Sequence, residues 1–317
     1  MKAAVHNRYG PPVVVEIKQL PDPAPAPGQI LVRVEAATVC APDWRFRSAT
    51  PFLIRTMTGL MRPAKDKVLG FEFAGHVAAL GEGVTRFAVG DPVFGAAGVG
   101  MGAHAELLCV KAGPSVQRRP PGFTAYEAAA IPYGGATALH FLRKAGVKVG
   151  DEVLIHGASG GVGVSMIQLA KHFGARVTAV ASARNQGFVL GLGADRAIDY
   201  ATADFSAEGA RYDIVADCVG KATFAQCRRA TKPGGGIVQV APTLGAMLSG
   251  MFAAGGRRVV AGVATGRPDD MAVLAEIAAR GGLKPPIEQV FPLADIVEAH
   301  RLSESGRKRG HVAVAMD

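Results

Sequence analysis

The segment of this chain that most constrains its fold runs from Asp151 to Val180, with the sequence DEVLIHGASGGVGVSMIQLAKHFGARVTAV. Glu152–His156 is a short apolar run typical of a buried parallel strand, and Gly157–Gly163 is a glycine-rich turn. Gly174 stands where a helix C-terminus favours a left-handed residue, and Arg176–Val180 reads as a second strand. Between them, apolar residues recur at helical spacing: Val162, Met166, Leu169, Ala170 and Phe173. The segment therefore predicts strand, turn, helix and strand in succession.

The glycines of this turn leave room for a pyrophosphate. A pyrophosphate binds at a helix N-terminus, where free N–H groups and the helix dipole favour negative charge and larger side chains would block the approach. The pattern reads as G-x-x-G-x-x-G at Gly157, Gly160 and Gly163, or as G-x-G-x-x-G with Ala158 in the first place. Because it follows a strand and opens a helix within a βαβ unit, it predicts a dinucleotide site rather than a turn without a ligand.

The residues after the second strand favour NADPH over NADH. An NAD site usually carries Asp or Glu about 20 residues beyond the turn, to bind the ribose 2′-hydroxyl. Here the place is occupied by residues 181–185, ASARN, which contain no carboxylate. Ser182 can hydrogen-bond a 2′-phosphate and Arg184 can pair with its charge, although Arg184 could also be a solvated surface charge. Tyr200, after a third strand, could close the adenosine pocket or simply pack there.

Length, composition and charge indicate how many domains the chain can form and which partners fit it. The chain has 317 residues, enough for two domains, and is 49% hydrophobic, enough to build real cores. Its net charge is +9, from 35 basic and 26 acidic residues, and the densest basic run is Arg307–Arg309. Scattered charge of this kind fits attraction of an anionic cofactor better than a nucleic-acid-binding surface. We expect no nucleic-acid partner.

Cysteine spacing and hydropathy indicate the cellular compartment in which the protein is expected. Cys40, Cys109, Cys218 and Cys227 form no C-x-x-C pair, so neither a structural zinc cluster nor a disulfide framework is expected. The N-terminal residues MKAAVHNRYG lack the apolar core of a signal peptide, and no apolar run is long enough to span a bilayer. We expect a cytoplasmic protein without a membrane partner.

Patterning divides the chain into two domains. Residues 1–118 hold short strand signals separated by Gly and Pro, and residues 287–317 return to strand, short helix and strand, so that we expect the tail to pair back onto the first domain. Thr124 and Glu127 form a plausible capping box where the character changes. Six strands follow, at 152–156, 176–180, 197–199, 212–217, 237–240 and 258–263, and they predict a doubly wound parallel sheet. The predicted domains are therefore 1–118 with 282–317, mostly β, and 119–281, α/β.

The order of these pieces resembles the medium-chain dehydrogenase/reductase superfamily, over essentially the whole chain. The resemblance is carried by LGFEFAGHVAALGEGVTRFAVGDPVFG (69–95), AAAIPYGGATALHFL (128–142), VLIHGASGGVGVSMIQLAKHFGA (153–175), LGADRAIDY (192–200) and YDIVADCVG (212–220). Within the superfamily the chain is most similar to the zinc-free, quinone oxidoreductase-like branch. The resemblance implies a GroES-like catalytic domain, a Rossmann domain, a cleft between them and a homodimer.

The family's zinc ligands are mostly replaced. The zinc alcohol dehydrogenases carry Cys in a G-V-C-H-[ST]-D type motif, matched here by Cys40. They carry His in G-H-E, where this chain has Phe71, and Cys or an acidic residue at the third place, where counting back from Thr137 gives Tyr133. One ligand of three cannot hold a catalytic zinc. We expect no metal, and alcohol oxidation is disfavoured without a Lewis acid.

A zinc-free site of this family can reduce a quinone or an α,β-unsaturated carbonyl by hydride transfer from NADPH. The developing enolate or phenolate then needs a hydrogen-bond donor and a proton. Tyr133 is the candidate donor, because the resemblance places it where the third zinc ligand would face the nicotinamide; it could also act by packing alone. Cys40 faces the same pocket, as a lining thiol rather than a nucleophile, where quinone reductases of the family often have Asn.

Further contacts follow from the resemblance. The turn would bind the pyrophosphate through Ser159, Gly160, Gly161 and Val162, and the nicotinamide half would be bordered by Thr137, Val219 and Ala241. Trp44, Phe46, Phe52 and the loop 244–252 could line an apolar substrate pocket or belong to the core. Two other functions stay open: a zinc-dependent alcohol dehydrogenase, and a protein that binds NADPH without turnover.

Overall fold

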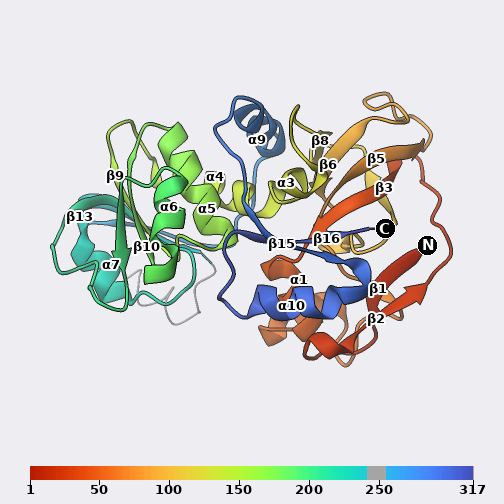
Figure 1. Ribbon diagram of the computed structural model, residues 1–317, viewed down its shortest axis with the longest axis horizontal. Coiled ribbons are helices and arrows are strands. Elements are labelled where there is room, and N and C mark those ends of the chain that lie inside the picture. Colours follow the sequence, from red (N-terminus) through yellow and green to blue (C-terminus); the bar gives the residue numbers. More distant parts are fainter. Residues whose placement is uncertain (241–254, 317) are drawn as a thin grey trace. The chain divides into compact units, whose positions relative to one another are not determined.

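The computed structural model describes residues 1–240 and 255–316 (Figure 1). They form two compact units. Unit 1 comprises residues 1–133, 271–279 and 285–317, and unit 2 comprises residues 134–270 and 280–284. The chain thus leaves unit 1 after Tyr133, later than the predicted boundary at 118, and returns first at residues 271–279 and then from residue 285, on either side of the predicted boundary at 282.

Unit 2 is built on one six-stranded sheet in which every neighbouring pair is parallel, in the order β11-β10-β9-β12-β13-β14. Helix α5 packs on β9 and β10, α6 on β10 and β11, and α7 on β12 and β13. The doubly wound α/β fold predicted from the sequence is confirmed. The strands are β9 (Glu152–His156), β10 (Arg176–Ala181), β11 (Arg196–Asp199), β12 (Tyr212–Asp217), β13 (Thr231–Val240) and β14 (Arg258–Gly262). The helices are α4 (Pro132–Ala145), which begins in unit 1, α5 (Gly161–His172), α6 (Gln186–Gly191) and α7 (Phe224–Ala230). Helix α9 (Asp270–Ala279) belongs to unit 1 except for Asp270.

The central βαβ segment folds as its sequence predicts. Gly174 follows α5 with a φ of +80°, the left-handed conformation expected where the helix ends. The interior of this half is a cluster of fully buried apolar side chains around Leu154, Val180 and Val215, one from each of three neighbouring strands. These strands are apolar on both faces because helices cover both, as in other parallel sheets.

Unit 1 is mostly β. Its larger sheet has the order β15-β16-β3-β5-β6-β8, with β7 also paired to β3, and a small sheet has the order β2-β1-β4. The strands are β1 (Lys2–His6), β2 (Val15–Gln19), β3 (Gln29–Thr38), β4 (Lys67–Val68), β5 (Glu72–Leu80), β6 (Pro92–Ala96), β7 (Leu107–Lys111), β8 (Val116–Arg118), β15 (Ile287–Pro292) and β16 (His311–Ala315); the helices are α1 (Ala41–Ser48), α2 (Arg55–Thr58), α3 (Ala125–Ala129) and α10 (Ile296–Glu304).

Two sequence predictions about unit 1 are confirmed in detail. Thr124 caps α3, with its Oγ1 accepting a hydrogen bond from the Glu127 N–H at 3.2 Å and Glu127 Oε2 accepting one from the Thr124 N–H at 2.9 Å. The C-terminal strand β16 pairs antiparallel with β3, Ala313 opposite Thr38, so the tail does return to the first sheet.

Two short helices, α1 and α2, were not predicted. Helix α1 begins at a Cys-Ala-Pro-Asp sequence, and its polar and aromatic residues show no apolar stripe that would reveal a helix. Among the residues that the structure describes, no helix is long and apolar enough to cross a bilayer.

Candidate active site

The glycine-rich turn of unit 2 is shaped by close approaches. Gly157 has a φ of +76°, and a Cβ on it would lie 2.5 Å from Val219 Cγ1. A Cβ on Gly163 would lie 2.4 Å from the Gly157 carbonyl oxygen and 2.7 Å from Ala158 Cα. Side chains are therefore excluded at both positions. The turn lies tightly over β9 and carries α5 directly behind it, which is the packing that a pyrophosphate-binding turn requires.

The N-terminus of α5 has no side-chain cap among the described residues; Gly160 is its N-cap, with extended backbone. The first-turn N–H groups of a helix have no partner within it, so they are available to an anion. Asn185, in the short helical turn after β10, fixes the glycine-rich turn, because its Nδ2 donates to Ser159 Oγ at 3.1 Å. The predicted residues Ser159, Gly160, Gly161 and Val162 all lie in this turn.

The predicted 2′-phosphate residues lie at the same edge of the sheet. Ser182 follows β10 directly, and Arg184 is exposed in the short helical turn after it. Because β10 and β11 are parallel with Ala181 opposite Asp199, Ser182 and Tyr200 lie side by side; Tyr200 is 60% exposed. Asp199 Oδ1 accepts a hydrogen bond from the Ala201 N–H at 3.0 Å, so this carboxylate is engaged in its own turn.

A buried His–Asp pair, which the sequence analysis did not identify, fixes the backbone that follows β12. His156 Nδ1 lies 3.0 Å from Asp217 Oδ1, which also accepts hydrogen bonds from the N–H groups of Val219 (3.1 Å) and Gly220 (3.0 Å). Burial opposes ionisation of Asp217, but the hydrogen bonds from His156 and Val219 outweigh it and lower its pKa. The carboxylate thereby holds Val219, a predicted nicotinamide-side residue, against Gly157.

In unit 1, Cys40 and Asp43 form a closed hydrogen-bonded pair at the start of α1. Asp43 Oδ2 accepts from the Cys40 N–H at 2.7 Å and from the Cys40 thiol at 3.1 Å, and both residues are buried. Burial, together with the charge of Asp43, raises the pKa of Cys40 well above its usual range. The thiol stays protonated, in agreement with a pocket-lining role and not with a nucleophile.

Glu72 joins β3, β5 and the start of α4. It is fully buried; Oε2 accepts a hydrogen bond from Thr38 Oγ1, and Oε1 accepts one from the Tyr133 N–H at 2.5 Å. Burial raises the pKa of Glu72 to about 7. The carboxyl therefore fixes the backbone of the predicted proton donor, a function that the sequence could not assign because the partners are 34 and 61 residues away.

Phe71 and Tyr133 stand together where a zinc site would need ligands. Their rings meet edge-on, with centroids 6.2 Å apart and an interplanar angle of 82°. Burial raises the pKa of the Tyr133 phenol, which thus keeps its proton. The described residues contain no cluster of three or more His, Cys, Asp or Glu side chains able to hold a metal ion. With Phe71 in the imidazole's place, Cys40 is left as one thiol donor, too few for a catalytic zinc.

Lys308 is a cation near this cluster that sequence reasoning missed. Lys308 lies just before β16. The start of β16 is close to the end of β3, because the Val39 N–H donates to the Val312 carbonyl at 3.0 Å and Ala313 pairs with Thr38. Its Nζ donates to the Gly310 carbonyl at 2.7 Å and has no ion-pair partner among the residues described. Burial lowers the pKa of Lys308, against the opposing effects of Cys40 and Glu72. In the sequence it is merely one of three consecutive cations.

The other predicted residues have mixed placements. Thr137 is buried in α4. Trp44 and Phe46 are half-buried on α1, whereas Phe52 is 67% exposed. Ala241 and the loop 244–252 lie outside the described residues. The carboxyl edge of the unit 2 sheet thus gathers the predicted phosphate and adenosine residues, and unit 1 gathers Cys40 and Tyr133. The individual contacts to a cofactor stay predictions.

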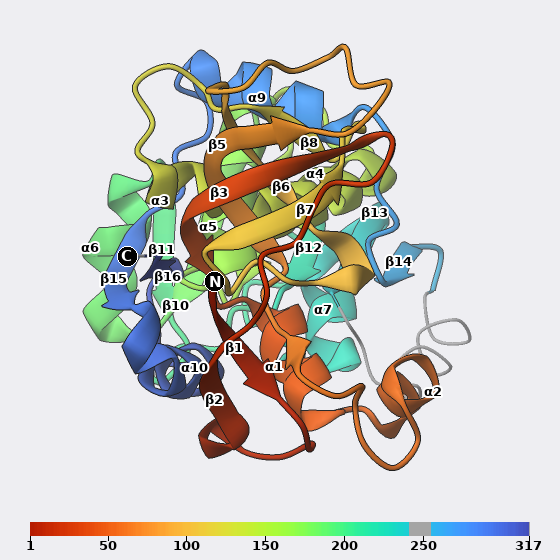
Figure 2. The ribbon, with the colours of Figure 1, turned by 90° about the vertical axis from the view of Figure 1, so that its right-hand side faces the viewer.

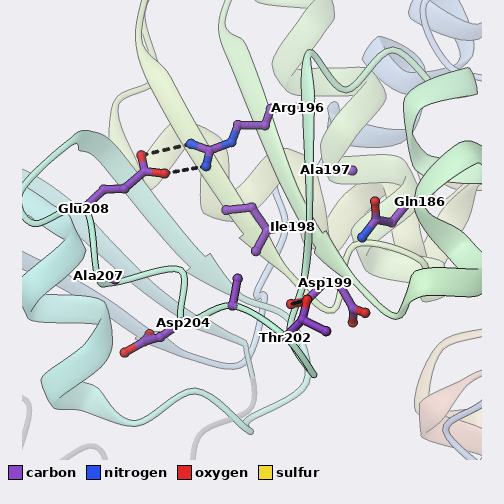
Figure 3. Close-up of a pocket in the computed structure, with 10 residues that line it drawn as sticks. Gln186, Arg196, Ala197, Ile198, Asp199, Thr202, Asp204, Ala207 and Glu208 are labelled. Carbon is purple, nitrogen blue, oxygen red and sulfur yellow. Dashed lines mark hydrogen bonds and ion pairs between the residues drawn. The ribbon is translucent and has the colours of Figure 1, made fainter.

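Unit 2 also has a pocket away from the glycine-rich turn, with a volume of about 380 Å³ (Figure 3). The ion pair between Arg196 and Glu208 lies on one side of it, and Asp199 and Thr202 lie at another. None of the predicted cofactor residues lines this pocket. Its lining residues are Gln186, Arg196, Ala197, Ile198, Asp199, Thr202, Ala203, Asp204, Ala207 and Glu208.

Comparison with known proteins agrees with this geometry. Residues 26–121 match the alcohol dehydrogenase GroES-like domain, and residues 192–314 match the zinc-binding dehydrogenase family. The chain is 30% identical over 331 residues to the chloroplast envelope quinone oxidoreductase homolog of Arabidopsis thaliana, covering 99% of this chain and 98% of that one. It is 31% identical over 330 residues to 2-methylene-furan-3-one reductase of Solanum lycopersicum, covering 99% and 79%.

Solved structures show the same fold. The quinone oxidoreductase from Coxiella burnetii superposes with a TM-score of 0.90 at 32% identity, covering 100% of this chain and 99% of that one. The Escherichia coli quinone oxidoreductase complexed with NADPH has a TM-score of 0.85 at 24% identity, with full coverage of both. The chain belongs to the medium-chain dehydrogenase/reductase superfamily, in its quinone oxidoreductase-like branch.

Proposed function

We propose that this protein is an NADPH-dependent, zinc-independent reductase of quinones or α,β-unsaturated carbonyl compounds. The observation that carries the proposal is the Phe71–Tyr133 ring pair beside Cys40 and Glu72. It replaces metal ligands with an apolar ring and a protonated phenol. Such a site favours reduction of an activated acceptor over oxidation of an alcohol, which needs a Lewis acid.

The residues of unit 2 fit a nicotinamide dinucleotide. Added Cβ atoms at Gly157 and Gly163 would fill the turn, and the α5 N-terminus offers uncapped N–H groups for a pyrophosphate. Ser182 and Arg184 follow β10 without a carboxylate, which favours a 2′-phosphate and hence NADPH. When bound, NADPH supplies the hydride.

The unit 1 residues would stabilise the negative charge that forms on the acceptor and supply a proton to it. Hydride addition to an enone or quinone places negative charge on oxygen, and one proton completes the two-electron reduction. Tyr133 is the proposed hydrogen-bond and proton donor, with its backbone fixed by Glu72. The Lys308 ammonium adds positive charge near the same cluster. Cys40 stays a thiol and lines the pocket.

The test is oxidation of NADPH and of NADH with a panel of ortho-quinones, para-quinones and enones, with and without a chelator. We expect chelator-insensitive turnover that prefers NADPH. Metal analysis of protein purified without added zinc accompanies it, since stoichiometric, tightly held zinc would favour the alcohol dehydrogenase alternative instead. Tight NADPH binding without oxidation by any acceptor would favour a protein that binds the cofactor without turnover.

Assembly and compartment remain predictions of the sequence. Strand β14 is the last described strand of the unit 2 sheet, and an edge strand of this kind can pair with a second copy. Sedimentation velocity would test whether the protein is a homodimer, and cell fractionation would test the expected cytoplasmic location.

A further inference from the structure

Between α1 and β5 the chain makes an excursion, residues 51–62, that includes α2 (Figure 2). It presents large apolar side chains to solvent. We call it the apolar loop. Half of the ten residues from position 52 to 61 are large, apolar and mostly exposed: Phe52 (67%), Leu53 (71%), Met57 (64%), Leu60 (65%) and Met61 (90%). Apolar residues exposed singly are ordinary, but a contiguous group marks an interaction surface.

The outward direction of these side chains is built into the loop. Tyr9 contacts the loop on its inner side. Its hydroxyl donates to the Gly59 carbonyl at 2.7 Å, and the Arg55 guanidinium lies 4.9 Å from its ring centroid. Gly59 has a φ of +123°, and a Cβ there would lie 2.1 Å from the Arg62 carbonyl oxygen. The conformation of the loop is therefore set by contacts of Tyr9, Arg55 and Gly59 within unit 1, whereas its large apolar side chains are exposed to solvent.

The charge around the loop has one sign. From Trp44 to Lys65 the chain carries five cations and no carboxylate. Arg47 is buried and paired with Glu304, but Arg62 and Lys65 are exposed and have no ion-pair partner among the residues described. The next acid, Asp66, is bound by Lys18 at 2.6 Å. The rim of the apolar loop is thus positive and not neutralised locally.

We infer that the apolar loop docks on the surface of an anionic lipid bilayer. Peripheral proteins bind such membranes by inserting large apolar side chains at the boundary between headgroups and acyl chains. Lys and Arg beside these side chains contact the lipid phosphates. A second copy of the chain fits less well, because a two-fold contact would bring the same cations face to face. This inference departs from the sequence-based expectation of no membrane partner. That expectation depended on the lack of a spanning segment, which excludes only insertion across the bilayer and not binding at its surface.

The test measures co-sedimentation with vesicles of phosphatidylcholine alone and of equal parts phosphatidylcholine and phosphatidylglycerol. We expect binding to the anionic vesicles only, weakened by high salt. Arg62→Gln with Lys65→Gln removes two charges and should weaken binding roughly 30-fold. Leu53→Asp with Met61→Asp should abolish it. Phe52→Trp should give a blue-shifted emission on the vesicles that the wild type, with Trp44 alone, lacks.

Val149→Asp with Val263→Asp is the matched control. These residues are 85% and 82% exposed in unit 2, and the double change alters charge and apolar surface as the loop variant does. The control should bind like the wild type. Melting temperatures of all variants verify that they are folded, and the Arg62/Lys65 variant tests the inference separately if the aspartates do not permit folding.

Four results would overturn the inference. They are no wild-type binding to anionic vesicles at low salt, equal binding by the loop and control variants, self-association that only the loop variant loses, and loss of turnover of a water-soluble quinone by the loop variant without vesicles. The third assigns the loop to a second copy and the fourth to the substrate pocket. Vesicle binding needs no turnover, so failure of the proposed reductase function would be seen separately.

Discussion

At the scale of single residues, burial decides which side chains of the unit 1 cluster hold a proton. Burial raises the pKa of Cys40, Glu72 and Tyr133 alike. The thiol and the phenol are therefore neutral near neutral pH, while the pKa of Glu72, about 7, makes it the group that titrates there. The Tyr133 phenol can therefore donate a hydrogen bond to an acceptor oxygen, while the Cys40 thiol donates to Asp43.

Replacing Tyr133 by Phe tests the proposed donor. The change removes the hydroxyl and retains the ring contact with Phe71, so we expect kcat to fall roughly 100-fold with KM for the cofactor unchanged. Steady-state kinetics with the best quinone or enone acceptor measures it. An unchanged kcat would limit Tyr133 to packing.

Glu72→Gln tests the buried carboxyl through pH. The folded-state pKa of about 7 lies above the ordinary value of 4.5, so the stability due to this group is full below 4.5 and is lost as pH rises to about 7. Relative to the Gln variant, the wild type should lose about 3 kcal/mol of unfolding free energy over that range. Urea unfolding at several pH values measures the difference; a constant difference would contradict the prediction.

At the scale of elements, a strand and the turn after it define the adenosine end of the site. Strand β10 carries an arginine at each end, Arg176 at its start and Arg184 in the turn that follows it. Only the second lies at the carboxyl edge, where ligands bind in open α/β sheets.

Arg184→Ala should raise KM for NADPH about 10- to 100-fold and leave KM for NADH unchanged, because a charge-assisted hydrogen bond to a 2′-phosphate is lost. Arg176→Ala, at the other end of the same strand, is the control and should leave both values unchanged. Equal effects of Arg184→Ala on the two cofactors would argue against 2′-phosphate recognition.

The contact between the turn and α5 gives a second prediction at this scale. Gly163→Ala should lower the unfolding free energy by about 1–3 kcal/mol, since its Cβ would overlap backbone atoms of the turn. Gly187→Ala, in α6 with open space around it, should instead stabilise by about 0.4–1 kcal/mol. Urea unfolding of both variants makes the comparison, and similar effects would show that the close approach is relaxed at little cost.

At the scale of the whole molecule, unit 1 contains a buried basic cluster between its sheets and α10. The His104 and His300 rings meet edge-on at 5.7 Å, and both ring nitrogens of His300 are buried without a hydrogen-bond partner among the described residues. The Arg47 guanidinium also lies close enough to oppose a positive charge on this ring. Protonation of His300 would therefore place a buried charge near a cation and without a hydrogen-bond acceptor among the described residues.

Burial, reinforced by His104 and Arg47, lowers the pKa of His300 well below its usual value. The stability that follows is full above pH 6.5 and is lost as pH falls below it. We expect His300→Leu to reduce the fall in melting temperature between about pH 7.5 and pH 5, on either side of the ordinary histidine pKa. His172→Gln, at an exposed site, is the control. A fall as steep in His300→Leu as in the wild type would place acid sensitivity elsewhere.

The sequence by itself determined the βαβ segment, the glycine-rich turn and the capped helix at Thr124. Each depends on neighbouring residues, through apolar periodicity, glycine conformation and capping chemistry. The sequence also predicted that the tail returns to the first domain, but its pairing with β3 was decided by the tertiary structure. Only the tertiary structure decided that Glu72 fixes Tyr133, that Lys308 lies near Cys40, and that residues 52–61 face solvent. Those facts depend on contacts between residues far apart in the chain. Burial, which sets both pKa and exposure, exists only once the chain has folded.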